Sequence, residues 1–277
     1  MFLRTLRRLA PALVVLAVLA TTAAGCNWPD GTRYVHPVFT SVTTTKDIPY
    51  RTTTDYQGNP ITLKLDVYRP QGDTVTNRPA VIWSFGGAWL AGNKGQLAPY
   101  ATDSAKRGYV GITIDYRIRS QVGPVLDMAG DAYDDTLAAV AFVKAHAAEY
   151  GINPNAIIAA GYSAGAINSM NAAFWPGERG PATSPVAGAV AIAGFTFGKP
   201  VKGDPPVLMF HGDSDTIVPY GTGQGTCQAT KDVGNSCRFY TYPGLGHEIG
   251  ATQMTSIMER TADWIFEIVL YPLGYRE

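Results

Sequence analysis

The feature that most constrains the fold is a serine in a glycine-flanked turn directly after an apolar run. Residues 161–165 have the pattern G-x-S-x-G with Ser163 at its centre, and residues 156–160 are all alanine or isoleucine. Such a run predicts a strand that is buried on both faces. The flanking glycines fit a turn in which a Cβ would strike the neighbouring strand or helix. Small residues follow at 164–174, so we predict a sharp strand-to-helix turn that lifts the Ser163 hydroxyl clear of the backbone.

Two later strand ends carry the groups that a serine nucleophile needs. A serine hydroxyl is a weak nucleophile at neutral pH unless a base accepts its proton, and an acid must orient that base. One apolar run leads into a segment that contains Asp213 and Asp215, and a later run precedes His247. The chain order of serine, acid and histidine, each just past a strand end, predicts a nucleophilic site along one edge of a sheet.

Four other blocks extend this pattern along the chain. They are residues 65–70, 83–89, 114–117 and 211–215. Together with the serine turn they resemble the α/β-hydrolase superfamily, on its bacterial esterase and lipase side near the hormone-sensitive-lipase-like carboxylesterases. The blocks follow the family's order. They are specific for the fold and much less specific for the substrate.

The resemblance implies a role for each polar residue at the strand ends. Ser163 would be the nucleophile, His247 the general base and Asp215 the acid. The family pattern H-G-x-x-D-x-x-V-P places the acid at Asp215, whereas a shift of two residues would place it at Asp213. Asp213 is otherwise expected to accept N–H groups of its own turn. His211 is expected to pack or hydrogen-bond in the acid loop, and is the alternative base.

An acyl-transfer site also needs N–H donors for the oxygen that becomes negative in the tetrahedral intermediate. The resemblance implies the N–H of Ala164 as one donor and those of Gly87 and Ala88, in the loop after a strand at 80–84, as the others. Related esterases usually have H-G-G-G in this loop, and here Phe85 replaces the histidine. The backbone donors remain, but the anchoring of the loop stays open. The alternative is a Gly-Gly turn without a catalytic role.

Alternating apolar strands and helices predict an α/β fold, namely the α/β-hydrolase fold with a mostly parallel central sheet and helices on both faces. The segment between the strand at 186–193 and the next strand is short, so we expect little or no cap. Predicted strands are 61–68, 80–84, 110–115, 156–160, 186–193, 206–210 and 238–242, and predicted helices are 128–150, 163–174, 222–233 and 253–270. We expect residues 26–55 to form an N-terminal arm or edge hairpin and residues 56–277 to form one catalytic domain.

An uncovered site would admit small-molecule or polymeric esters. Trp89, Tyr162, Phe195 and Phe197 are candidates for an apolar rim that holds the substrate, and the alternative is that they fill the core.

The N-terminus has the pattern of an export signal. Three arginines precede a short apolar stretch, and small residues follow up to Cys26. The apolar stretch is shorter than the 20 or so residues that a membrane span needs. Residues 1–25 are therefore expected to be a signal peptide, and lipidation of Cys26 would resemble bacterial lipoprotein processing, although Ala23 stands where that motif usually has leucine. The protein is expected to be exported, either lipid-anchored to the cell envelope or freely secreted.

The chain has three cysteines. Cys227 and Cys237 flank a short loop, and in an oxidising compartment we expect them to form a disulfide. This pairing leaves Cys26 as the odd cysteine, which lipidation would explain.

Composition argues against several other classes. The 277 residues contain 22 Lys plus Arg and 22 Asp plus Glu, so no basic face for nucleic acid is expected. The run of Asp131, Asp134 and Asp135 has helical spacing, and we expect it to cap a helix rather than to bind a metal. No cofactor is implied.

These observations predict a serine carboxylic ester hydrolase that acts through an acyl-enzyme intermediate. A serine exopeptidase of the same fold is one alternative, but it would need acidic residues that hold a substrate amine. A non-catalytic binding lipoprotein is the other.

Overall fold

The computed structural model describes residues 28–175 and 183–276 of the chain. The expected signal peptide, residues 1–25, and Cys26 lie outside the described residues.

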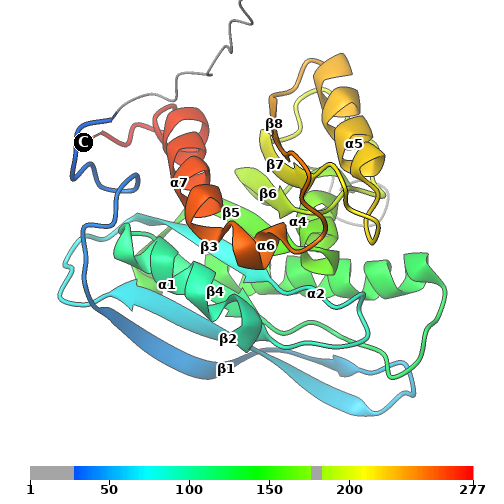
Figure 1. Ribbon diagram of the computed structural model, residues 1–277. Helices are drawn as coiled ribbons and strands as arrows, with labels where there is room; N and C mark the ends of the chain where they lie inside the picture. The colour runs from blue at the N-terminus through cyan, green and yellow to red at the C-terminus, as the bar shows by residue number, and fades with distance from the viewer. Residues whose placement is uncertain (1–27, 176–182, 277) are drawn as a thin grey trace, which may run out of the picture.

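An eight-stranded sheet forms the centre of the molecule, in the order β1-β2-β4-β3-β5-β6-β7-β8 (Figure 1). The six strands from β4 to β8 in this order are parallel, whereas β1 pairs with β2, and β2 with β4, in antiparallel register. The strands are β1 Val42–Thr54, β2 Pro60–Pro70, β3 Arg78–Ser84, β4 Val110–Ile114, β5 Ile152–Tyr162, β6 Gly188–Ile192, β7 Val207–Gly212 and β8 Cys237–Tyr242.

Helices cover both faces of this sheet (Figure 1). Helices α1, α6 and α7 pack on one face, and α2, α3, α4 and α5 pack on the other. Their bounds are η1 Lys94–Leu97, α1 Ala98–Lys106, α2 Val125–Ala145, α3 Ala147–Tyr150, α4 Ala164–Phe174, α5 Tyr220–Asp232, α6 Ile249–Thr252, α7 Met254–Trp264 and the π-helical segment η2 Ile265–Leu270.

Two-sided burial explains the apolar runs of the central strands. In β3, Val81 and Trp83 join the core under α1 and α7, while Ala80 and Ile82 face the core under α2. All four are at most 1% exposed. The predicted α/β-hydrolase architecture is confirmed, and each predicted strand is present.

The helices differ from prediction in two ways. The predicted helix at 128–150 is divided at His146 into α2 and α3, and the one at 253–270 is divided into α7 and η2, with the short helix α6 before it. Helix α1 was not predicted. Its buried face is made of Tyr100 and the small residues Ala101, Ser104 and Ala105, which give a weak apolar pattern.

The N-terminal segment corrects the expected domain boundary. Tyr34 and Val35 are buried in the main core, and β1 forms an edge hairpin with β2. The boundary expected between residues 55 and 56 therefore falls inside this hairpin. The described residues before it belong to the same domain, because the hydrogen bonds of β1 are made to β2.

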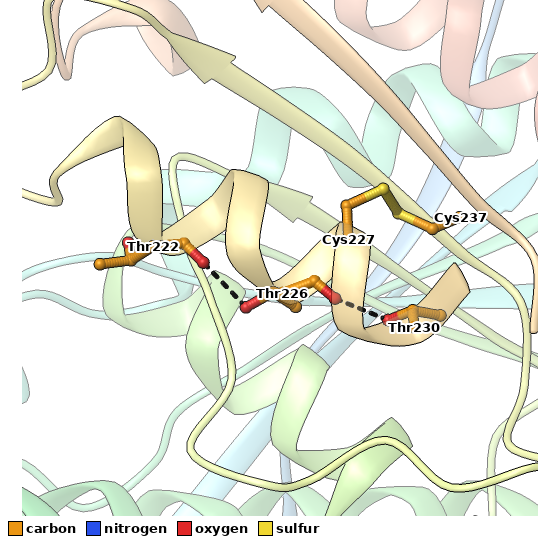
Figure 2. The surroundings of a disulfide bond; sticks show 5 residues. All are labelled: Thr222, Thr226, Cys227, Thr230 and Cys237. Atoms are coloured by element: carbon orange, nitrogen blue, oxygen red, sulfur yellow. Dashed lines mark hydrogen bonds between the residues drawn. A yellow bond between two sulfur atoms is a disulfide. The ribbon is translucent and has the colours of Figure 1, made fainter. Parts of the chain in front are cut away.

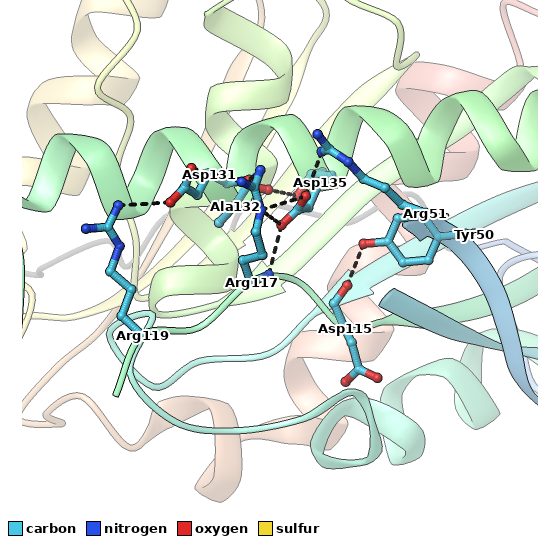
Figure 3. Close-up of polar contacts among 9 residues, drawn as sticks. Tyr50, Arg51, Asp115, Arg117, Arg119, Asp131, Ala132 and Asp135 are labelled. Atoms are coloured by element: carbon cyan, nitrogen blue, oxygen red, sulfur yellow. Dashed lines mark hydrogen bonds and ion pairs between the residues drawn. The ribbon is translucent and has the colours of Figure 1, made fainter. Parts of the chain in front are cut away.

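A buried ion-pair network fixes the loop that follows β4 (Figure 3). The Asp135 side chain is fully buried in α2 and accepts hydrogen bonds from Arg51 of β1, 2.6 Å away, and from Arg117. Asp131 pairs with Arg117 and Arg119. The expectation that this acidic run caps a helix is wrong. These residues lie beyond the first turn of α2, and the N–H groups beyond the first turn are already bonded within the helix. Within residues 28–175 and 183–276, no group of three or more His, Cys, Asp or Glu side chains is placed so that it could hold a metal ion.

The segment between β6 and β7, residues 193–206, contains no helix, so it builds no helical cap over the sheet. No helix among the described residues is long and apolar enough to cross a membrane.

Candidate active site

Ser163 lies in the sharp turn between β5 and α4, as its sequence context predicts. Its backbone has φ 55° and ψ −122°, a conformation that is strained for a residue with a side chain. A Cβ on Gly161 would lie 2.3 Å from the carbonyl oxygen of Gly165, and a Cβ on Gly165 would lie 2.0 Å from that of Ser84. Only glycine fits both positions. The Ser163 N–H donates to the carbonyl of Ile192 on the neighbouring strand, 2.9 Å away, which holds the turn in place.

The structure brings Ser163, His247 and Asp215 into one hydrogen-bonded chain. Nε2 of His247 lies 2.9 Å from Oγ of Ser163, and Nδ1 of His247 lies 2.8 Å from Oδ2 of Asp215. The Asp215 side chain is fully buried, whereas the His247 side chain is 17% exposed. This geometry allows His247 to accept the serine proton while Asp215 stabilises the imidazolium that forms.

The acid loop holds Asp215 as a carboxylate. Burial raises its pKa, but hydrogen bonds from His247 and from the N–H groups of Val218 and Ile217 outweigh this effect and lower the pKa overall. Asp213 lies outside the hydrogen-bonded chain. Its carboxylate accepts the hydroxyl of the adjacent Ser214 and the N–H of Gly244, 2.7 Å away in the loop that carries His247. The expectation that it accepts N–H groups of its own turn is therefore wrong, since the N–H comes from the neighbouring loop.

His211 lies beneath the acid loop and is fully buried. Its Nε2 lies 2.9 Å from the carbonyl oxygen of Val218 and 3.3 Å from Oδ2 of Asp215. Burial is the main cause that lowers its pKa, so His211 is neutral and its Nε2–H supports the loop. The alternative assignment of His211 as the base is therefore not supported, since Ser163 is bonded to His247.

The loop after β3 is built for close approach. Gly87, Ala88 and Trp89 all have positive φ, at 125°, 54° and 60°. A Cβ on Gly87 would lie 2.0 Å from the carbonyl oxygen of Ala91, so this position requires glycine. Ala164 begins α4, where N–H groups have no intrahelical acceptor. In the described part of the chain, the N–H groups of Gly87, Ala88 and Ala164 make no hydrogen bond, which leaves them free to bind a developing oxyanion.

Long-range contacts anchor this oxyanion loop in place of the family's histidine. The ring of Phe85 stacks on that of Tyr116 at 4.2 Å, and the Tyr116 hydroxyl donates to the Phe85 carbonyl at 2.7 Å. The N–H of Arg119 donates to the Trp89 carbonyl at 2.8 Å, and Nε1 of Trp89 donates to Oδ1 of Asn168 at 2.8 Å. The segment that carries Tyr116 and Arg119 is the one that the Asp135 network fixes (Figure 3).

Two hollows flank the oxyanion loop, and we call them the small and the large hollow. The small hollow has a volume of 200 Å³ and the large one 540 Å³. Ser163, Ala164 and Ala88 line the small hollow, and Gly86, Gly87 and Tyr162 line the large one. The loop and the serine turn thus separate the two.

The four residues expected to form one apolar rim are divided between these hollows. Trp89, Phe195 and Phe197 line the small hollow, whereas Tyr162 lines the large one. Trp89 is only 5% exposed, so it forms a wall rather than a rim.

The structure joins Cys227 of α5 to Cys237 of β8 by a disulfide, as predicted (Figure 2). Helix α5 follows the acid loop, and β8 leads into the loop that carries His247. Beside the disulfide, the hydroxyls of Thr226 and Thr230 each donate to the carbonyl four residues earlier in α5 (Figure 2). The bond therefore ties together the two segments that present the acid and the base.

Sequence reasoning included Tyr116 in the block at 114–117 but missed its contact with the oxyanion loop, and it missed Asn168 altogether. The signal for Tyr116 was its place directly after a strand end beside the catalytic edge of the sheet. Asn168 carried a weaker signal, a polar residue five positions after Ser163 on a helix that is otherwise small or apolar apart from Ser169 and Asn171.

Known proteins that are similar to this chain include ester and thioester hydrolases. The family described as BD-FAE matches residues 65–175, and the family described as Phospholipase/Carboxylesterase matches residues 134–265. A probable carboxylic ester hydrolase of Mycobacterium tuberculosis is 36% identical over 116 residues, which cover 41% of this chain and 26% of that protein. An acyl-protein thioesterase 1 of Gibberella zeae is 33% identical over 107 residues, which cover 35% of this chain and 43% of that protein. The chain thus spans less than half the length of these curated relatives.

Solved structures match over more of the chain. An esterase from Thermogutta terrifontis is 25% identical with a TM-score of 0.67, and the match covers 79% of this chain and 92% of that one. The same esterase phosphorylated by paraoxon is 26% identical, again with a TM-score of 0.67, over 79% of this chain and 94% of that one. The chain thus has the α/β-hydrolase fold, and its serine turn and these matches make it similar to carboxylesterases of that fold.

Proposed function

We propose that this protein hydrolyses carboxylic esters through a serine acyl-enzyme. The observation that carries the proposal is the hydrogen-bonded chain from Ser163 through His247 to Asp215, with distances of 2.9 and 2.8 Å. It lies beside unbonded N–H groups at the end of β3 and the start of α4. A nucleophile, an oriented base and oxyanion donors are the parts that acyl transfer requires.

In this mechanism Ser163 attacks the ester carbonyl carbon while Nε2 of His247 takes the hydroxyl proton. The carbonyl oxygen becomes negative and binds the N–H groups of Gly87, Ala88 and Ala164. Collapse of this intermediate breaks the bond to the alcohol oxygen, which receives the proton from His247 and leaves as the alcohol. Water then attacks the acyl-enzyme, with His247 again as base, and releases the carboxylic acid.

Two further observations support the proposal. The Thermogutta esterase with the same fold is phosphorylated by paraoxon, which is the behaviour of an enzyme with an activated nucleophile. None of the described residues that line either hollow is acidic. A serine exopeptidase would need a carboxylate there to hold the substrate amine, so the lining favours esters.

The site of action proposed here is outside the cytoplasm, with Cys26 as the first mature residue and a lipid anchor on its sulfur. The arginine-rich start and apolar stretch support export, and the Cys227–Cys237 disulfide is typical of proteins in oxidising compartments.

The replacement Ser163→Ala tests the function. We expect hydrolysis of p-nitrophenyl acetate to fall by about 10⁴-fold or more, because the loss of a triad residue leaves only binding and the oxyanion donors. Ser169→Ala is the matched control, since Ser169 is a buried serine of the same helix whose hydroxyl donates to the Gly165 carbonyl. Thermal unfolding of both variants checks that the fold is retained. Folded Ser163→Ala with more than a few per cent of the wild-type rate would refute the proposal.

A further inference from the structure

We propose that the large hollow binds the alcohol half of the ester, and that preferred substrates combine a short acyl group with a bulky apolar alcohol. This inference rests on the proposed ester hydrolysis. It assigns each half of the substrate to one side of the oxyanion loop.

The first argument is the position of the large hollow on the His247 side of the serine turn. Its wall includes Gly250, Ala251 and Met254, which follow His247 in the chain. Tyr162 lines the hollow and also contacts the base: its hydroxyl donates to the His247 carbonyl at 2.9 Å, and its ring centroid is 5.2 Å from that of His247.

The second argument is the path of the proton. The leaving alcohol oxygen must take its proton from Nε2 of His247, so the alcohol half lies within hydrogen-bond reach of that ring when the bond breaks. The acyl half stays on Ser163 through the second step and must fit beside it. Ser163 and Ala164 line the small hollow, which therefore takes the acyl group.

The third argument is size. The large hollow, at 540 Å³, falls in the range of pockets that bind whole small molecules, about 300–1,000 Å³. The small hollow, at 200 Å³, is smaller than this range, and the rings of Trp89, Phe195 and Phe197 form part of its wall. A short acyl chain fits the second volume and an aromatic or branched alcohol fits the first.

The fourth argument is polarity. None of the side chains that line the large hollow is charged. The Tyr100 hydroxyl is bonded to the Gly250 carbonyl and the Tyr162 hydroxyl to the His247 carbonyl, so both present ring surface to the hollow rather than a free hydroxyl. Gln96 supplies the one side-chain amide in the lining. The lining therefore selects an apolar alcohol over a sugar or a charged alcohol.

A pair of isomeric esters tests the assignment directly. In 2-naphthylmethyl acetate the ring is on the alcohol side, and in methyl 2-naphthylacetate it is on the acyl side. The alcohols released are 2-naphthylmethanol and methanol, and neither is an activated phenol. We expect kcat/KM of the wild-type protein to be higher for the first isomer by on the order of 10-fold or more, since an extra group that a pocket cannot hold costs about this factor. A preference for the second isomer, or equal rates, would overturn the assignment.

Ala251→Trp then probes the wall. Ala251 is exposed and lines the large hollow, so a tryptophan there fills it without disturbing the core. We expect the ratio of kcat/KM for the first isomer over ethyl acetate to fall by about 10-fold or more. Thr252→Trp is the matched control, because Thr252 is the exposed neighbour in α6 that does not line the hollow, and it should keep the wild-type ratio. The same fall in both variants, or in neither, would contradict the proposal.

Val125→Trp makes the opposite test, since Val125 is 48% exposed and lines the small hollow. It should lower the ratio of kcat/KM for ethyl butyrate over ethyl acetate. It should leave unchanged the ratio of kcat/KM for 2-naphthylmethyl acetate over ethyl acetate. The proposed function fails separately, if the wild-type protein hydrolyses no ester in a Ser163-dependent way. Hydrolysis with the wrong preference overturns the assignment of the hollows alone.

Discussion

The acid loop and the oxyanion loop present groups to the same Ser163 but are held in different ways. The Asp215 carboxylate is held mainly by local bonds: it accepts the N–H groups of Ile217 and Val218, two and three residues further on, and His211 supports the Val218 carbonyl from the preceding strand. The start of the same loop also bonds to the segment before His247, through the Ser214 N–H to the Leu245 carbonyl and the Gly244 N–H to Asp213. The oxyanion loop is held from elsewhere, by Tyr116 and Arg119 after β4 and by Asn168 of α4. The acid group is thus oriented by bonds within its own loop, while the oxyanion donors depend also on side chains from distant parts of the domain.

This difference should separate the effects of substitution. A change in the acid loop removes a charge from the reaction itself, whereas a change in the anchors of the oxyanion loop displaces donors that remain present. The first change weakens electrostatic stabilisation and should lower the rate strongly. The second change only shifts the donors and should lower the rate less.

The largest effect is expected at the acid. Asp215→Asn should lower kcat by on the order of 10³–10⁴-fold, because the amide no longer stabilises the imidazolium and favours the wrong tautomer of His247. Asp213→Asn is the matched control from the same loop, and should cost less than about 10-fold, since Asp213 bonds the Ser214 hydroxyl and the Gly244 N–H and not the imidazole of His247. Both are measured on one substrate. The reverse ranking would show that the acid loop is assigned wrongly.

A moderate effect is expected at the anchor of the oxyanion loop. Tyr116→Phe keeps the ring that stacks on Phe85 and removes the hydroxyl that donates to its carbonyl. We expect kcat to fall about 2- to 10-fold with little change in KM, because a net hydrogen bond of about 0.5–1.5 kcal/mol is lost and the donors act mainly on the transition state.

Tyr109→Phe is the control for this change. Tyr109 is also a buried tyrosine whose hydroxyl donates to a backbone carbonyl, that of Tyr34, 2.7 Å away. It should lower the melting temperature and leave kcat unchanged. Equal losses of kcat in the two variants would mean that Tyr116 acts through stability alone and that the comparison of the two loops does not hold.

The smallest effect on the rate is expected at the disulfide behind the acid and base segments. The double replacement Cys227→Ser and Cys237→Ser should lower stability by about 2–3 kcal/mol on chain-entropy grounds, which is a fall of about 4–12 °C in melting temperature for a chain of this size. Specific activity at low temperature should stay near that of the wild type. Reductant should produce the same fall in the wild-type protein and none in the double variant, whereas unchanged melting in both experiments would show that the bond adds no stability.

The sequence predicted the locally held region better than the region held from a distance. Ser163, Asp215 and His247 each follow a strand, and their context in the chain was sufficient to place them. The anchoring of the oxyanion loop depends on side chains that are 31 and 79 residues away along the chain, Tyr116 to Phe85 and Asn168 to Trp89. No local pattern reports such contacts, and the same reason explains why the partner of β1 and the division into two hollows were not foreseen.

The edge strand β1 has a consequence for the behaviour of the protein at high concentration. An edge strand of 13 residues offers a row of unpaired backbone groups on which another chain could add as a further strand. Here the register shifts twice, between Thr45 and Ile48 and between Pro49 and Arg51. Pro49, which lacks an N–H, and the exposed charged side chain of Lys46 lie within the same stretch. This edge is therefore irregular and charged, so it resists the sheet-to-sheet growth that leads to aggregates.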